Sequence, residues 1–388
     1  MNGSSQDEPF KIKRSSDGAP PKEPAIGSEQ DPTVEEPAHA ATSEIAQRMG
    51  RQLAAQMEEQ GYHPVVLFGS AASGKSSLLA SLLAYLQVDT SAKVQIQLGD
   101  QLILDDDAYG SEAHKEASTF FYRSVEEFIG GKAHASTQAK YPFFIPVVLK
   151  PHGNLPEMKF AFLESRGEWY QPKMDTNEVF QRLKEEVSGV LLNFSKGISF
   201  LHVAPYTQVN TWDEDAVSQQ GKDLQLRKEA DLALVGALNA YKIVRPLKHE
   251  DAHLFLISKW DAYAPPGSPT GSFSAPSVEE VQGVALERYS RGYTAFCSLH
   301  LGDQDLWQKQ IMQYSSGLIS GRSILAPTGD VREQVYRYPR VLWNWLYENA
   351  TRGGGHARKL FPNPPPPKPT LAEKCRLVLA RILKAMGV

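Results

Sequence analysis

Short apolar runs alternate with longer amphipathic stretches through most of the chain. Seven of these runs have the length and composition of strands, namely residues 63–69, 93–99, 143–150, 158–164, 197–205, 252–260 and 310–316. Strands that alternate with helical patterns are typical of a mostly parallel sheet covered by helices on both faces. The pattern therefore predicts an α/β fold, a three-layer sandwich around a central sheet.

A helical repeat precedes the first strand, and another follows the last. Ile45, Met49, Leu53 and Met57 recur every four residues, and Gly61 stands where this helix would end. A second apolar helical stretch covers residues 339–350. We expect one folded domain over residues 42–350, with an N-terminal helix that starts near Thr42.

The two ends of the chain differ from this domain in composition. Residues 1–41 are rich in Pro, Ser, Glu and Asp and contain few large apolar side chains, which predicts a disordered tail. Residues 351–369 form a Gly- and Pro-rich linker, and residues 370–388 form an amphipathic helix with basic residues off its apolar face. Such a helix can dock on a protein partner, on a membrane surface or on the domain itself, and these three alternatives stay open.

Charge and cysteine content exclude several classes of function. The net charge of -4 and the pI near 6.2 provide no general attraction to nucleic acid, and we expect none to bind. The two cysteines, Cys297 and Cys375, are too few for a disulfide framework or a zinc site. The N-terminus lacks the apolar core of a signal peptide, so we expect a cytoplasmic protein.

The loop after the first strand matches the phosphate-binding pattern G-x-x-x-x-G-K-[ST] at every fixed position. Glycines let backbone N–H groups curl around phosphate oxygens, the lysine neutralises the β and γ charges, and the serine hydroxyl ligates Mg²⁺. The predicted nucleotide-binding residues here are Gly69, Ser70, Ala71, Ala72, Ser73, Gly74, Lys75, Ser76 and Ser77.

A second motif follows the strand at 252–258. Ser258, Lys259 and Asp261 resemble the [NT]KxD element with which GTPases read guanine, with Ser in the first place. The aspartate would accept two hydrogen bonds from the guanine N1–H and exocyclic amine, a donor pair that adenine lacks. The motif therefore favours GTP and GDP as ligands.

The strand at 158–164 ends in a sequence similar to the DxxG switch of GTPases. Glu164 replaces the aspartate and would face the Mg²⁺ shell, and Gly167 would donate its N–H to the γ-phosphate. Thr137 precedes the neighbouring strand, as the Mg²⁺-ligating switch threonine does in that family. Glu168 stands where other members carry the water-orienting Gln or His; a carboxylate can orient water, but it lies close to the γ-phosphate charge.

The last apolar run ends in Ser315 and Ser316, which resemble the Ser-Ala-Lys loop that contacts guanine from its other side. The stretch at 294–302 is an alternative for this loop.

The order and spacing of these motifs resemble a TRAFAC-class P-loop GTPase, and most of all the prokaryotic double-GTPase-type domains associated with bacterial multi-protein conflict systems. The resemblance covers residues 60–350 and implies Mg²⁺-dependent GTP hydrolysis used as a switch and read by a protein partner. It assigns metal ligation to Ser76, Thr137 and Glu164, and catalytic roles to Lys75, Thr137 and Glu168.

Two alternatives remain open at this point. The absent Gln or His is also consistent with a guanine-nucleotide-binding module that does not hydrolyse its ligand. An ATP-using kinase or ATPase would follow if the Ser258–Asp261 match were accidental.

Overall fold

The computed structural model describes residues 36–89, 92–102, 107–132, 143–165, 185–207, 216–245, 250–263, 277–299, 309–320, 323–325, 330–352 and 358–361. Contacts divide the chain into residues 1–42 and residues 43–388, and the whole sheet belongs to the second unit. Over the part of the chain that is described, no helix is both long and apolar enough to span a bilayer.

The central sheet has seven strands in the order β2-β3-β4-β1-β5-β6-β7. Strand β3 runs antiparallel to β2 and β4, and the remaining neighbours are parallel. The strands are β1 Tyr62–Phe68, β2 Val94–Leu98, β3 Phe143–Pro151, β4 Met158–Glu164, β5 Ser199–Pro205, β6 Ala252–Ser258 and β7 Lys309–Gln313. Each of the seven predicted runs forms one of these strands.

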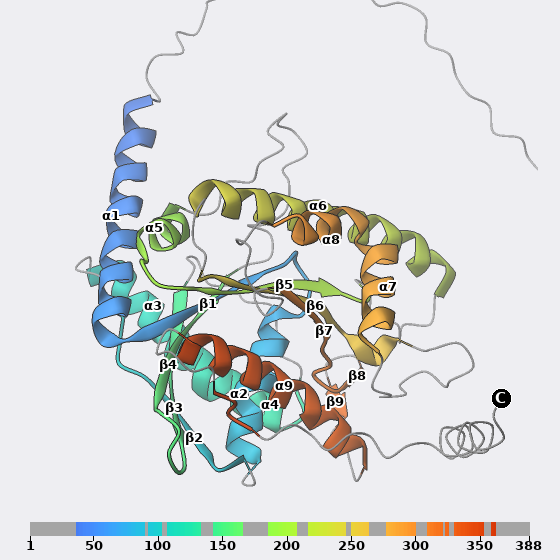
Figure 1. Ribbon diagram of the computed structural model, residues 1–388. Coiled ribbons are helices and arrows are strands. Elements are labelled where there is room, and N and C mark those ends of the chain that lie inside the picture. The colour runs from blue at the N-terminus through green and yellow to red at the C-terminus, as the bar shows by residue number, and fades with distance from the viewer. Residues whose placement is uncertain are drawn as a thin grey trace, which may run out of the picture. The chain divides into compact units, whose positions relative to one another are not determined.

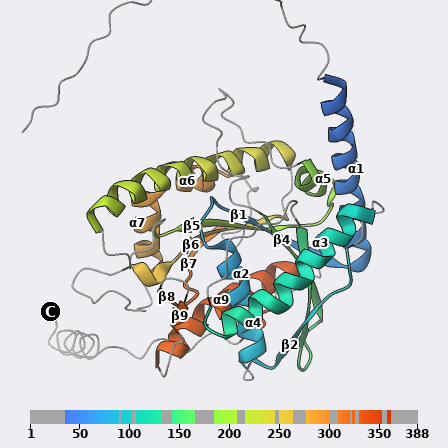
Figure 2. The same cartoon turned by 180° about the vertical axis from the view of Figure 1, so that it is seen from behind.

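Helices cover both faces of the sheet, which confirms the predicted three-layer P-loop sandwich. Helices α2, α4 and α9 lie on one side, and α5, α6 and α8 lie on the other (Figures 1 and 2). The helices are α1 Glu36–Gln60, α2 Lys75–Val88, α3 Asp107–Thr119, α4 Val125–Ile129, α5 Glu185–Asn193, α6 Ala216–Val244, α7 Val278–Arg288, α8 Ser290–Cys297 and α9 Asp330–Arg352. A π-helical segment, η2 Phe120–Ser124, joins α3 to α4, and η4 Trp260–Ala262 is a 3₁₀ turn.

The core forms because the central strands are apolar on both faces. Strands β5 and β6 are buried at every position, as parallel strands between two helical layers must be. Trp343 of α9 packs edge-on against Phe160 and Phe162 of β4. Its indole N–H donates to the Leu82 carbonyl of α2 at 2.8 Å, so α9 joins the sheet to the helix that follows the phosphate-binding loop.

Helices α1 and α9 both begin earlier in the chain than the sequence pattern predicts. Helix α1 begins at Glu36, ahead of the expected start at Thr42, and α9 begins at Asp330 and continues through Pro339. In the segment expected to be a linker, Leu360 and Phe361 are buried, and Phe361 exchanges two backbone hydrogen bonds with the Asn344 amide, at 2.7 and 3.1 Å. A short antiparallel ribbon, β8 Leu318–Ser320 and β9 Ser323–Leu325, has no counterpart among the predicted elements.

Candidate functional site

The phosphate-binding loop connects β1 to α2 and depends on its two glycines. A Cβ atom at Gly69 would lie 2.6 Å from Ser73 Oγ and 2.8 Å from the Val203 carbonyl, so a side chain cannot be accommodated there. Gly74 has φ 87°, a left-handed conformation that strains other residues. These constraints explain both fixed glycines of the motif.

Helix α2 starts at Lys75 without a side-chain cap. The first backbone N–H groups of an α-helix point away from its own hydrogen-bond ladder, and the helix dipole adds partial positive charge at the same place. The loop thus has the local structure that binds phosphate.

Lys75 folds back over the loop that precedes it. Its Nζ donates to the carbonyls of Gly69 at 2.8 Å and Ser70 at 3.0 Å, and the residue is 6% exposed. A cation held by its own loop is positioned beside the space that the loop encloses, where phosphate oxygens can compete for its protons.

Ser76 and Glu164 meet although they lie far apart in the chain. The Ser76 hydroxyl donates to Glu164 Oε1 at 2.5 Å, and Glu164, at the end of β4, is buried. This brings together two of the residues predicted to hold Mg²⁺. A hydroxyl and a carboxylate are hard oxygen donors, which fit the ligand preference of that ion.

The segment predicted to read guanine leaves β6 and contacts the predicted phosphate-binding loop directly. The Ser258 hydroxyl donates to the Ser73 carbonyl at 2.6 Å, and both residues are buried. Lys259 has φ 53°, a left-handed conformation that turns the chain into η4. The contact between Ser258 and Ser73 joins the two predicted halves of the site.

Asp261 lies against the loop that follows β7. The Ser315 hydroxyl donates to Asp261 Oδ1 at 3.1 Å and accepts from the Gly317 N–H at 3.2 Å. Burial raises the pKa of Asp261, and the hydrogen bond from Ser315 and the charge of Lys259 act against that rise. Burial lowers the pKa of Lys259, while Asp261 and Asp223 raise it.

Ser81 and Tyr314 extend this network in a way that the motifs did not indicate. Their hydroxyl groups lie 2.7 Å apart, and Ser81 Oγ also lies 3.4 Å from Ser316 Oγ. Helix α2 is thereby connected to the loop that holds Asp261. The available signal was a polar residue, Ser81, inside the otherwise apolar run of α2.

Three predicted site residues, Thr137, Gly167 and Glu168, lie outside the described residues. The alternative stretch at 294–302 starts within α8, so its first residues do not follow a strand. The predicted helix at 370–388 is also outside the described part of the chain.

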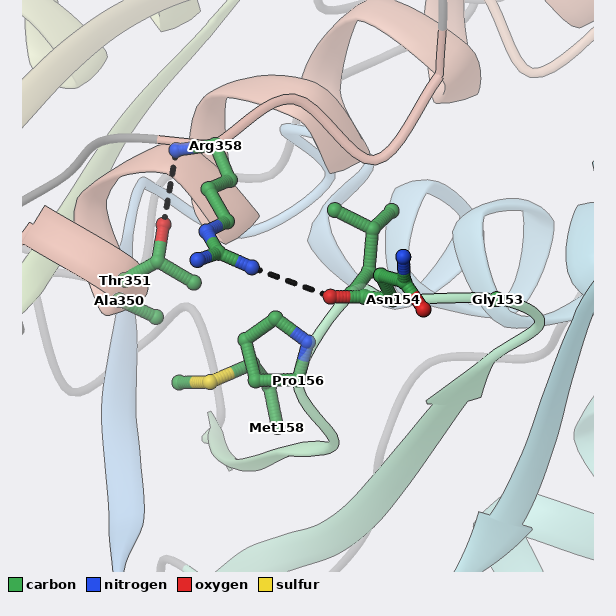
Figure 3. Close-up of a pocket in the computed structure, with 8 residues that line it drawn as sticks. Gly153, Asn154, Pro156, Met158, Ala350, Thr351 and Arg358 are labelled. Carbon is green, nitrogen blue, oxygen red and sulfur yellow. Dashed lines mark hydrogen bonds between the residues drawn. The ribbon is translucent and has the colours of Figure 1, made fainter.

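A cavity of about 510 Å³ lies where β4 begins, at the end of that strand opposite Glu164 (Figure 3). Arg358 donates from Nη1 to the Asn154 carbonyl and from its backbone N–H to Thr351 Oγ1, both at 3.1 Å. Leu155, Met158 and Ala350 supply apolar lining. Among the described residues that line the cavity, Arg358 is the one that carries a charge.

The comparison with known proteins shows similarity of fold only. No family model and no curated protein matches the chain. Similar solved structures include Toc33 from Arabidopsis thaliana in complex with GDP and Mg²⁺, which is 10% identical, covers 76% of this chain and 92% of that chain, and has a TM-score of 0.31. A bacterial dynamin pair is 14% identical over 84% of this chain and 46% of that chain, with a TM-score of 0.28. Values this low carry no functional argument.

Proposed function

We propose that this chain binds a guanine nucleotide together with Mg²⁺ at the carboxyl edge of its sheet and hydrolyses GTP as a conformational switch. The observation that carries the proposal is the hydrogen bond from Ser258 to the Ser73 carbonyl. In this contact, Ser258 of the proposed base-reading motif bonds the proposed phosphate-binding loop, and one nucleotide that spans both elements requires such proximity.

The environment of Asp261 supports guanine as the base. A partly buried carboxylate needs donors, and Ser315 supplies one to Oδ1 of Asp261. The guanine N1–H and exocyclic amine would add the two donors that adenine cannot present. An adenine nucleotide would leave this acceptor unpaired, at a cost of about 1–3 kcal/mol.

Ser76 and Glu164 support Mg²⁺ binding, with Thr137 as a further proposed ligand. When bound, Mg²⁺ would neutralise charge on the β and γ phosphates. Lys75 would bind the same phosphates. Gly167 would report the γ-phosphate to the switch, and Glu168 would orient the attacking water.

The finer assignment follows the resemblance in the sequence. We propose a double-GTPase-type domain within a multi-protein bacterial system, acting in the cytoplasm. A protein partner would read the switch segments near Thr137 and Glu164 or bind the C-terminal helix at 370–388, for which a membrane surface is the alternative target.

Competition among GTP, ATP and xanthosine triphosphate tests the choice of base. We expect wild type to prefer GTP over ATP by at least about tenfold. Asp261→Asn should lose GTP and gain xanthosine triphosphate, because xanthine carries a carbonyl where guanine carries the amine and the new amide donates to it. Asp100→Asn, the same change at an exposed position away from the site, is the control.

A wild type that binds ATP as tightly as GTP would overturn the guanine assignment and favour the kinase or ATPase alternative. Phosphate release from bound GTP, followed over hours, tests hydrolysis separately. Stable bound GTP would instead identify a binding module that does not hydrolyse its ligand.

A further inference from the structure

Strand β2 forms one edge of the central sheet (Figures 1 and 2). Within the described ranges, β3 is the strand that pairs with β2. Natural edge strands are commonly protected by Lys, Pro or a bulge, because a free edge can pair with another chain. Residues 94–98 read Val-Gln-Ile-Gln-Leu and contain neither Lys nor Pro.

The hydrogen bonds to β3 show which backbone groups of β2 face outward. The Gly99 N–H donates to the Pro146 carbonyl, and the His152 N–H donates to the Lys93 carbonyl, both at 2.9 Å. In an antiparallel pair, alternate residues bond the same neighbour, so positions 93, 95, 97 and 99 face β3. The N–H and C=O groups of Val94, Ile96 and Leu98 therefore point to the outer edge.

This outer edge is symmetric about Ile96. We propose that β2 pairs antiparallel with β2 of a second copy of the chain, around a two-fold axis at Ile96. In that register Ile96 bonds its own counterpart, and Val94 bonds Leu98 of the other copy. All three outward-facing residues of each strand then find partners.

The charges beside the strand fit the same arrangement. Lys93 precedes β2, Asp100 follows it, and both are exposed. Antiparallel pairing places the start of one strand beside the end of the other. Each Lys93 would thus lie opposite Gly99 of the second copy, one position from its Asp100, so that a positive and a negative charge are near each other at both ends of the interface.

Apolar surface lies next to the edge. Ile96 and Leu98 are partly buried against the core and, with Phe121 and Tyr122 of η2, line a cavity of about 460 Å³. Tyr122 is 63% exposed, so it can contact a chain that pairs with β2. One strand pair makes a small interface, and we expect a dimer with a dissociation constant in the micromolar range, roughly 1–100 µM.

Charge exchange at Gln95 and Gln97 tests the pairing in the full-length protein. In the proposed dimer, the exposed Gln95 of one copy would lie directly opposite the exposed Gln97 of the other. These two residues form a pair without backbone hydrogen bonds, in which the side chains of the two strands are closest. The double variants Gln95→Lys/Gln97→Lys and Gln95→Glu/Gln97→Glu each place like charges opposite one another. Each should weaken dimerisation at least about tenfold in sedimentation equilibrium, whereas an equimolar mixture of the two should form a heterodimer.

The restored heterodimer separates the proposal from misfolding, because two damaged chains would not rescue each other. Gln310→Lys, at an exposed position on the opposite edge strand β7, is the matched control and should keep the wild-type affinity. A wild type that is monomeric at about 100 µM would overturn the proposal. So would double variants that dimerise like wild type, or a mixture that fails to form the heterodimer.

Discussion

Charged groups lie at both ends of the parallel strands, but they are held in different ways. At the amino end, Arg245 and Asp251 form an ion pair with fully buried side chains, with contacts of 2.6 and 2.8 Å. At the carboxyl end, Lys75 bonds loop carbonyls, and Asp261 accepts from Ser315.

The amino-end pair is completed by the protein itself. Arg245 also donates to the carbonyls of Leu191, Phe194 and Lys196, and Asp251 accepts from the Ile198 N–H and the Tyr241 hydroxyl. This cluster ties the end of α6 to the turn between α5 and β5. Its buried charges are compensated within the fold.

The carboxyl-end groups bond carbonyls and hydroxyls that phosphate, Mg²⁺ or a base could replace. The difference between the two ends indicates that the buried Arg245–Asp251 cluster stabilises the fold, whereas the proposed role of the carboxyl-end groups is to bind a ligand. Substitutions at the amino end should therefore change mainly stability, and substitutions at the carboxyl end should change mainly binding.

The largest effect is expected at Arg245. Arg245→Met should lower the free energy of unfolding by about 3–5 kcal/mol, because Asp251 remains buried without its cation. Urea unfolding measures this loss. Arg123→Gln breaks an exposed pair with Glu127 and should cost less than about 1 kcal/mol; equal losses in the two variants would refute the assigned role of the cluster.

Acid should lower the stability of the fold through histidines in the strands of the sheet. Burial lowers the pKa of His63 to about 4 and that of His202 to about 3, and the pKa of His253 also lies well below its usual value. In the unfolded chain each histidine takes up a proton near pH 6.5, whereas in the folded protein it stays neutral to a lower pH. The free energy of unfolding is therefore highest above pH 6.5 and falls as the pH decreases toward the pKa values of the folded state.

Between pH 7.0 and 5.5 we expect a loss of about 1 kcal/mol per histidine, or roughly 3–4 kcal/mol for all three. Urea unfolding of wild type and His63→Gln at both pH values checks this, since the variant should lose about a third less. His152→Gln, at an exposed position, should behave like wild type. A pH-independent stability would contradict the proposed neutral state of the buried rings.

Lys75→Met should weaken nucleotide binding without lowering the stability of the nucleotide-free protein. We expect GTP affinity to fall by about 2–3 kcal/mol in calorimetry, since charged hydrogen bonds to phosphate are lost, while the melting temperature without nucleotide is unchanged or higher. Lys309 also donates to two backbone carbonyls, of Cys297 and Leu299, so Lys309→Met is a matched control that should retain GTP affinity. Undiminished affinity in Lys75→Met would remove the loop from the proposed site.

The smallest effect is expected at Ser258, which connects the two halves of the site. Ser258→Ala should cost about 1 kcal/mol of stability and reduce the preference for GTP over ATP a few-fold, because the base-reading motif loses its bond to the phosphate-binding loop. Thermal unfolding and nucleotide competition measure the two effects. The matched control is Ser298→Ala, which removes an exposed hydroxyl that also donates to a backbone carbonyl, that of Ala295. This variant should change neither the stability nor the preference for GTP. An unchanged preference in Ser258→Ala would separate the base-reading motif from the loop.

Local pattern was sufficient to predict the strands, and it also located the candidate phosphate-binding loop between β1 and α2. Apolar runs of five to nine residues can be recognised without knowledge of their neighbours in space, and Gly69, Gly74 and Lys75 lie within a stretch of seven residues. The ribbon of β8 and β9 was missed because each strand has three residues. The start of α9 was misplaced because Pro339 resembles a first-turn proline, whereas in the structure it lies inside the helix.

The sequence by itself therefore determined the fold class and the residue types of the proposed site, since both depend on short-range spacing. The tertiary structure decided which of these residues meet: Ser76 with Glu164, Ser258 with Ser73, and Ser315 with Asp261. It also placed Ser81 against Tyr314, 233 positions away. Such pairs depend on strand order and helix placement, which bring distant segments together through packing of the whole core and leave no periodic trace in the chain.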